Sequence, residues 1–93
     1  MINRVLLSKF VKKQLKKLPY HIVENLEAWV DDVEERGLEE VKKIPGYHDE
    51  PLHGARRGQR SIRLSRGYRA IYFITDDGEI EFIAVMEVSK HEY

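Results

Sequence analysis

The chain has 93 residues, 42% of them hydrophobic and 34% charged, and its 16 basic residues balance its 16 acidic ones. This composition is typical of a globular protein rather than a disordered one, and the length fits one domain over residues 1–93. The absence of cysteine excludes disulfide bonds and thiolate metal sites. No apolar stretch approaches the roughly 20 residues that span a membrane, and the N-terminal residues show no signal-peptide pattern. We therefore expect a cytoplasmic protein without a membrane partner.

The chain is predicted to begin with a short strand and a helix. Residues 3–8, "NRVLLS", are short and branched enough at Cβ to form a strand. Ser8 is then placed to cap a helix that continues through Leu18 with lysines on its outer side. Pro19 is expected to end that helix because proline cannot continue the pattern of backbone hydrogen bonds.

A second helix is predicted from Tyr20 to Arg36. Apolar residues recur along it at helical spacing, and most of the remaining positions are acidic. The members of this apolar stripe are Ile22, Leu26, Trp29 and Val33. Gly37 suits the position directly after a helix, and residues 38–44 are predicted to form one further turn.

The second half of the chain is predicted to form strands over residues 61–65, 68–74 and 79–88. Residues 76–78, "DDG", are typical of a hairpin turn between the last two. Strict alternation along the last strand would point one set of side chains to the same side, namely Ile80, Phe82, Ala84, Met86 and Val88. We therefore predict an α+β fold, with two N-terminal helices packed on a twisted antiparallel sheet of about four strands.

Positive charge is concentrated in and just before the hairpin that strands 61–65 and 68–74 are predicted to form. Six of the eight arginines fall within residues 54–69, and no acidic residue interrupts them. Ile62 and Leu64 are expected to fill the core, so alternation sends Arg63 to the opposite face of the sheet. Arg69 can then lie across the ladder from Arg63. Two adjacent guanidinium groups without a nearby carboxylate would form a site for an anion such as phosphate.

The last predicted strand leads to Lys90, His91 and Tyr93. Whether they lie beside the arginines depends on strand register, which the sequence does not specify. A histidine can exchange protons near neutral pH, and a tyrosine can stack on a base. Cleavage of RNA by its own 2′-hydroxyl needs such a proton-transfer group together with donors for the phosphoryl oxygens. Such residues also occur at the surfaces of proteins that bind nucleic acids or acidic partners without any activity.

Three of the four histidines lie in the second half of the chain, at His48, His53 and His91. Their spacing matches no standard pattern of metal ligands, so we expect neither a metal nor another cofactor. His21 falls on the second predicted helix and is interpreted as structural or solvated.

Several ordered segments together resemble the RelE/ParE superfamily, in its RelE-, HigB- and YoeB-like branch. They are "PLHG", "RRGQRSIRLSRGYRAIYF" and "IEFIAVMEVSKHEY", which follow two predicted helices, and the resemblance covers nearly the whole chain. It implies a fold of the microbial ribonuclease type and a toxin of a type II toxin–antitoxin system. It further implies ribosome-dependent endonuclease activity on mRNA without a metal, and an antitoxin protein as partner.

Carried over residue by residue, the resemblance implies roles for particular side chains. Four match family positions implicated in catalysis: Arg63, Arg69, His91 and Tyr93. Others are expected to contact RNA phosphates: Arg56, Arg57, Arg60, Arg66 and Lys90. Ser61 departs from the pattern because RelE has a lysine there, and the net charge of zero departs from the usual basic character.

The general base and the target both have alternatives. His91 is the first candidate for the base, and Tyr47, His48 and His53 are further candidates from the preceding loop. The alternative function is that of a ParE-like poison of DNA gyrase that cuts nothing. The presence of both His91 and Tyr93 favours the nuclease, because ParE-like members generally lack a complete histidine–tyrosine ending.

Overall fold

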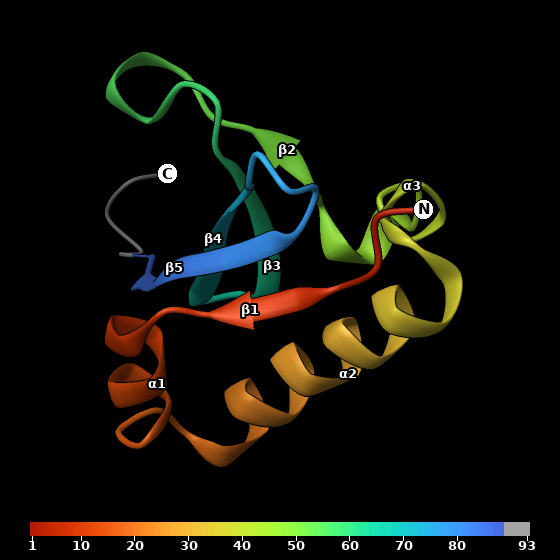
Figure 1. Ribbon diagram of the computed structural model, residues 1–93. Helices are drawn as coiled ribbons and strands as arrows, with labels where there is room; N and C mark the ends of the chain where they lie inside the picture. The colour runs from red at the N-terminus through yellow and green to blue at the C-terminus, as the bar shows by residue number, and fades with distance from the viewer. Residues whose placement is uncertain (89–93) are drawn as a thin grey trace.

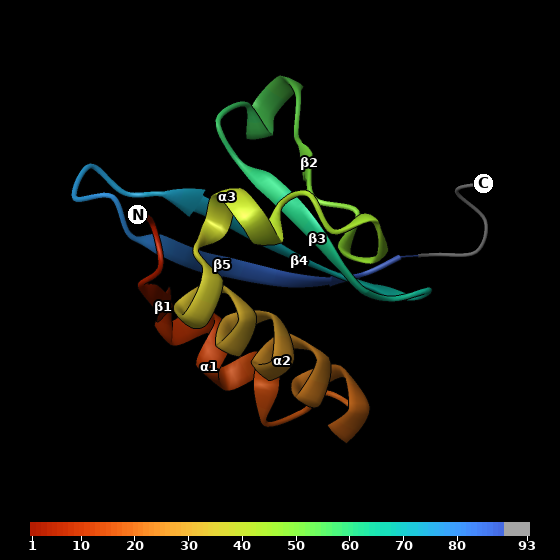
Figure 2. The ribbon, with the colours of Figure 1, turned by 90° about the vertical axis from the view of Figure 1, so that its right-hand side faces the viewer.

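The computed structural model describes residues 1–88 and consists of a sheet with helices packed on one face (Figure 1). The strands follow the spatial order β1-β5-β4-β3-β2, and Figure 2 shows α1 and α2 together on the same side of the sheet. The helices are α1 (Lys9–Leu15), α2 (Tyr20–Arg36) and α3 (Leu38–Val41), with short 3-10 turns at Pro45–Tyr47 and Gly54–Arg56. The strands are β1 (Val5–Leu7), β2 (Glu50–Pro51), β3 (Arg60–Ser65), β4 (Tyr68–Ile74) and β5 (Ile80–Glu87).

The two main helices begin where the sequence indicates. The hydroxyl of Ser8 accepts a hydrogen bond of 3.1 Å from the backbone N–H of Val11 and so caps α1. This helix ends at Leu15, three residues before the predicted end. Helix α2 has the predicted bounds, and it ends at Gly37, whose φ of 83° suits glycine.

The sheet differs from the prediction in strand number and in direction. It has five strands among the described residues rather than about four, because the two-residue strand β2 pairs with the start of β3. It is also not wholly antiparallel, since β1 runs parallel to β5. Parallel neighbours need a long connection, and here α1, α2 and the three strands that follow them in sequence supply it.

A β-bulge in β5 overturns the predicted alternation of that strand. Ile71 pairs with Ala84, but the next residue, Tyr72, pairs with Phe82, so Ile83 is an extra residue. The side-chain pattern therefore changes phase at this point. Val85 is buried in the core, whereas Met86, which strict alternation assigned to the same side as Phe82, is 43% exposed.

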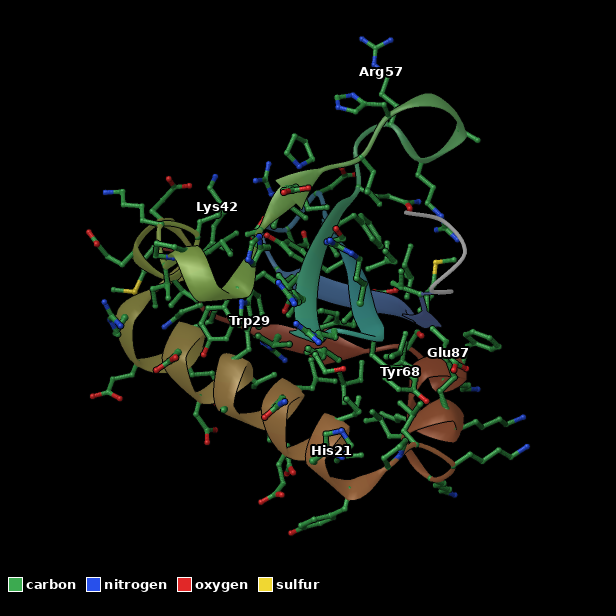
Figure 3. The ribbon with its side chains drawn as sticks, turned by 180° about the vertical axis from the view of Figure 1, so that it is seen from behind. His21, Trp29, Lys42, Arg57, Tyr68 and Glu87 are labelled. Atoms are coloured by element: carbon green, nitrogen blue, oxygen red, sulfur yellow. The ribbon has the colours of Figure 1, made fainter. Side chains whose placement is uncertain are left out.

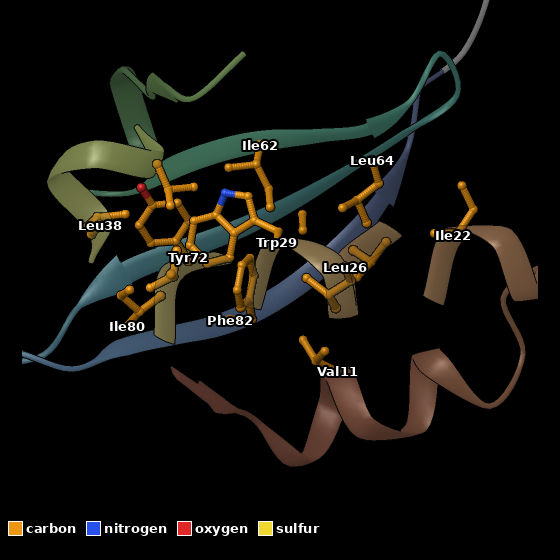
Figure 4. Packing of buried hydrophobic residues seen from close by; sticks show 14 residues of the cluster. Val11, Ile22, Leu26, Trp29, Leu38, Ile62, Leu64, Tyr72, Ile80 and Phe82 are labelled. Atoms are coloured by element: carbon orange, nitrogen blue, oxygen red, sulfur yellow. The ribbon is translucent and has the colours of Figure 1, made fainter. Parts of the chain in front are cut away.

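Three aromatic rings form the centre of the core, between α2 and the sheet (Figure 4). The ring centroids of Trp29 and Phe82 are 5.2 Å apart and nearly perpendicular, and Tyr72 lies 5.5 Å from each of them. All three side chains are fully buried. Their packing fixes α2 against β4 and β5, and the opposite face of the β3–β4 hairpin is left without a main helix.

Beyond the end of β1, the side-chain amide of Gln14 takes the place of a neighbouring strand and binds the backbone of β5. The backbone N–H of Ser8 makes the last hydrogen bond from this segment, to the carbonyl of Phe82. Further along β5, Gln14 of α1 donates from Nε2 to the Val85 carbonyl at 2.8 Å and accepts from its N–H at 2.7 Å. Gln14 thus satisfies both backbone groups that a neighbouring strand would otherwise bind.

Candidate functional site

Arg63 and Arg69 are direct cross-strand partners. A register shift at Leu64, between Arg63 and Ser65, brings them opposite each other, since an unbroken ladder from the pair Ser65–Tyr68 would place Ala70 opposite Arg63. They lie on the side of the β3–β4 hairpin that faces away from α2, because their neighbours Ile62, Leu64 and Ala70 are buried in the core. We call the surface that carries Ser61, Arg63 and Arg69 the arginine face. Within residues 1–88 neither guanidinium has a carboxylate at ion-pair distance. Two like charges that face each other in this way favour the binding of an anion.

The contacts that these two guanidinium groups do make are long. Nη1 of Arg69 lies 3.4 Å from the hydroxyl of Ser61, and Nη1 of Arg63 lies 3.4 Å from Nε2 of His48. Both distances exceed the usual range for a strong N–H···O or N–H···N hydrogen bond. Each guanidinium carries five N–H donors, so most of the donors of the pair make no hydrogen bond to residues 1–88.

A buried carboxylate fixes the segment that borders the arginine face. The side chain of Asp49 has no exposed surface, and its two oxygens accept bonds of 2.6 Å each, from Tyr72 Oη and from Arg60 Nε. Burial, the hydrogen bond that Tyr72 donates to Asp49 and the charge of that carboxylate raise the pKa of the Tyr72 phenol. The side chain of Asp49 points into the fold and binds Arg60 of β3 and Tyr72 of β4. These bonds anchor the segment that carries His48 and Glu50, the two neighbours of Asp49.

Both neighbours of Asp49 are exposed, and both border the arginine face. His48 contacts Arg63, as described above. Glu50 of β2 is the cross-strand partner of Ser61, and partners in an antiparallel ladder point to the same face. An imidazole and a carboxylate therefore lie at the edge of a surface whose centre carries two arginines.

The remaining arginines of the hairpin region do not form one continuous patch. Arg60 is half-buried and neutralises Asp49, so its contact with RNA stays a prediction and its observed role is within the fold. Arg56 bonds to Gln59 in the loop before β3, and Arg57 is exposed at the same loop. Arg66 is exposed in the two-residue turn at the other end of β3. Figure 3 shows how far Arg57 lies from Tyr68 and Glu87, which mark that turn.

The register of β5 shows where the last described residues lie relative to the arginines. Arg69 pairs with Met86 and Tyr68 pairs with Glu87, and the N–H of Val88 donates to the Gly67 carbonyl at 2.7 Å. The chain thus leaves β5 beside the β3–β4 turn and next to Arg69. Lys90, His91 and Tyr93 themselves lie outside the described residues, so their predicted roles stay predictions.

The loop candidates for the general base differ in where they point. Tyr47 donates its hydroxyl to Asp32 of α2 at 2.6 Å, away from the arginine face. Burial and this bond raise its pKa to about 12, which makes it a poor base near neutral pH. His53 is exposed at the start of the loop that carries Arg57. His48 is the one of these three that contacts an arginine of the face.

Asp49 and Glu50 are the two residues at this site that the sequence did not identify. The contacts that define their positions are made with Ser61 and Tyr72, which are distant in sequence, and β2 is only two residues long. A strand so short has no recognisable periodicity. The sequence shows only that residues 48–51, "HDEP", form a polar segment between two predicted elements.

The described part of the chain contains neither a metal-binding cluster nor a membrane-spanning helix. Across residues 1–88 no three His, Cys, Asp or Glu side chains cluster in a way that could hold a metal ion. No helix in the same range is long and apolar enough to cross a bilayer.

No family model matches the sequence, and no curated protein matches it closely enough to count as a relative. Solved structures do match. RelE in the archaeal RelE–RelB complex from Pyrococcus horikoshii superposes with a TM-score of 0.71 and 25% identity, over 97% of this chain and 99% of that one. A chain of the E. coli DinJ–YafQ toxin–antitoxin complex superposes with a TM-score of 0.71 and 21% identity, over 92% of this chain and 93% of that one. A chain of the RelBE2 toxin–antitoxin complex from Mycobacterium tuberculosis superposes with a TM-score of 0.69 and 21% identity, over 95% of this chain and 100% of that one. The arrangement of helices and strands described above is thus that of these toxins.

Proposed function

We propose that this chain, whose fold is that of the RelE/ParE superfamily of toxins, is an endoribonuclease that cuts mRNA on the ribosome. The observation that carries the proposal is the arginine face. Arg63 and Arg69 are held opposite each other by the hairpin register, without a carboxylate partner among the described residues. Two facing guanidinium groups that have no carboxylate partner within residues 1–88 favour the binding of an anion, and a phosphodiester supplies the geometry that arginine binds best.

The arginine face fits the needs of cleavage by the 2′-hydroxyl. In this reaction the 2′-oxygen attacks the adjacent phosphorus, charge builds up on the phosphoryl oxygens, and the 5′-oxygen leaves with a proton. Fixed cationic donors that point at the phosphoryl oxygens lower the barrier, and we assign this role to Arg63 and Arg69. One group must accept a proton and another must donate one. We propose His91 for one of these two roles and Tyr93 for contact with the nucleotide, on the family resemblance and on the exit of β5 beside Arg69.

We further propose that a cognate antitoxin inhibits the enzyme by covering the arginine face. The structures similar to this chain include toxins in complex with antitoxins. Since the net charge of the chain is zero, attraction of RNA or of an acidic antitoxin segment must come from local surfaces rather than from the whole molecule. Arg57 is exposed in the loop before β3 and Arg66 in the turn after it, and we propose that each contacts an RNA phosphate on its own side of the arginine face. The same role is proposed for Arg56 and Lys90.

Primer extension on a translated message tests this proposal. Wild-type protein is added to a translation reaction, to the same mRNA without ribosomes, and to a reaction with Arg69→Ala. We expect new 5′ ends only with ribosomes and wild-type protein. Loss of cleavage by Arg69→Ala, with unchanged circular dichroism, would place the chemistry on the arginine face.

An intact message in all three reactions, with folded protein present, would refute the nuclease. The alternative, a gyrase poison, would then be tested by the supercoiling of plasmid DNA. That activity would not depend on a proton-transfer residue, so His91→Ala would retain it.

A further inference from the structure

We propose that His48 is the catalytic base of the arginine face, and that the buried carboxylate of Asp49 is the positioning residue that holds it there. The inference rests on the proposed nuclease function and assigns the group that removes the 2′-proton. Three features of the structure support it: the contact of His48 with Arg63, the anchoring of Asp49, and the charges around the imidazole.

The contact between His48 and Arg63 defines which form of the imidazole fits the site. A guanidinium can only donate hydrogen bonds, so Nη1 of Arg63 cannot accept a proton from the ring. The contact of 3.4 Å with Nε2 is therefore a hydrogen bond only when Nε2 carries no proton. The base form that we propose for His48 therefore turns the lone pair of Nε2 toward Arg63. A bound phosphate would replace His48 as the acceptor for that arginine, which frees Nε2 to act as a base.

The backbone around His48 is held in an uncommon conformation. Its φ is 46°, and it is the only described residue other than glycine with a positive φ. Residues keep such a conformation only where their surroundings impose it. The N–H of His48 donates to the Pro45 carbonyl at 3.1 Å, and the following residue, Asp49, is bound by both Tyr72 and Arg60. These bonds fix the chain on both sides of His48 and point its ring toward β3.

The charges that face the ring suit a base next to a phosphate. Arg63 faces it from β3, and Arg69 lies across the ladder from Arg63. Glu50 is exposed two residues along the chain on β2. The other titratable neighbours are engaged elsewhere, because Tyr47 is bonded to Asp32 and the Asp49 carboxylate is turned into the fold.

Nε2 of neutral His48 takes the proton of the 2′-hydroxyl while the 2′-oxygen forms a bond to phosphorus and the bond from phosphorus to the 5′-oxygen breaks. The 5′-oxygen takes a proton from the general acid, the role that remains for His91. The products are a 2′,3′-cyclic phosphate and a 5′-hydroxyl end, and His48 returns its proton to water before the next cycle.

Single-turnover cleavage on programmed ribosomes tests this assignment, with saturating full-length protein over a range of pH. His48→Gln keeps the size of the side chain and a hydrogen-bond acceptor but cannot take up a proton. We expect its rate to fall by about 10²–10⁴-fold, the usual contribution of general acid–base catalysis. A general base acts only in its unprotonated form, so His48→Gln should lose the part of the pH dependence of the rate that the base contributes. His21→Gln is the matched control, since His21 is exposed on α2, and it should cleave at the wild-type rate.

Asp49→Asn tests the positioning role. If Asp49 aims His48, the folded variant should cleave more slowly with unchanged affinity for the ribosome, and the double variant His48→Gln/Asp49→Asn should be no slower than His48→Gln alone. If Asp49 only stabilises the fold, Asp49→Asn should cleave normally below its melting temperature, and that result would refute the positioning role.

The outcomes also separate the two proposals. Wild-type protein that leaves the message intact would overturn the nuclease and, with it, this inference. Cleavage by wild type and by His48→Gln at rates within about threefold would overturn the inference alone. The inference would also be overturned if His48→Gln kept the wild-type pH profile and Glu50→Gln lost it, since Glu50 would then be the base.

Discussion

Replacement of Asp49 by alanine should be among the most destabilising single changes at this site. The carboxylate is fully buried, and it accepts one bond of 2.6 Å from Tyr72 and one from Arg60. In Asp49→Ala the hydroxyl of Tyr72, a residue with no exposed surface, would lose its partner, at a cost of about 1–3 kcal/mol. The side chain of Arg60 is 26% exposed and can partly turn to water, so its lost bond should add only about 1 kcal/mol. The expected fall in the free energy of unfolding is about 3 kcal/mol.

Urea denaturation of four proteins measures this effect: wild type, Asp49→Ala, Tyr72→Phe and the double variant. Tyr72→Phe removes the hydroxyl donor, while the bond between Arg60 and the Asp49 carboxylate remains. It should therefore lower the free energy of unfolding by only about 1–2 kcal/mol. In the double variant no hydroxyl is left unpaired, and the total should fall short of the sum of the single costs by about 1 kcal/mol or more. Additive costs, or a cost below about 1 kcal/mol for Asp49→Ala, would show that the network is not coupled as described.

Three further changes test other parts of the fold. Gln14→Ala removes both bonds to the Val85 backbone and should lower the free energy of unfolding by about 1–3 kcal/mol in urea, whereas a loss below about 0.5 kcal/mol would mean that water replaces the amide. The raised pKa of Tyr47 means that its contribution to stability is complete below pH 10 and is lost as the pH rises toward 12. Thermal melts over this range should therefore show a smaller decline for Tyr47→Phe than for wild type, and identical declines would contradict the role of its bond to Asp32. Gly37→Ala should cost about 1–3 kcal/mol, because φ is 83° and the new Cβ would lie 2.6 Å from Cγ of Met1; an unchanged melting temperature would contradict this.

The elements that the sequence predicted well are those whose pattern is long and local. Helix α2 has four apolar residues at helical spacing and a glycine at its end, and its bounds were predicted without error. The β3–β4 hairpin was predicted with its turn because Arg66-Gly67 leaves only a two-residue connection. The sequence therefore placed Arg63 and Arg69 on neighbouring strands of one hairpin. Their direct pairing depends on a register shift at Leu64, which the two-residue turn does not predict.

The errors occurred where tertiary contacts decide the structure. Residues 83–86, "IAVM", are all apolar, so their hydrophobic pattern is compatible with either phase of alternation and does not reveal the bulge. The parallel pairing of β1 depends on the path of the helices that follow it. Strand β2 exists because Asp49 is bound by Tyr72, 23 residues later in the chain. The same long-range contact places His48 and Glu50 at the site, which is why neither position could be inferred from local sequence.

The most direct test of the arginine face is the rate of mRNA cleavage by Arg63→Ala and Arg69→Ala in single-turnover reactions on programmed ribosomes. Arg36→Ala is the matched control, since Arg36 is exposed at the end of α2. If both arginines stabilise charge on the phosphoryl oxygens, each of the two variants should cleave about 10²-fold or more slowly than wild type, with the control unchanged. Cleavage by Arg63→Ala and Arg69→Ala at the rate of the control would contradict the account, because the phosphate would then be bound elsewhere.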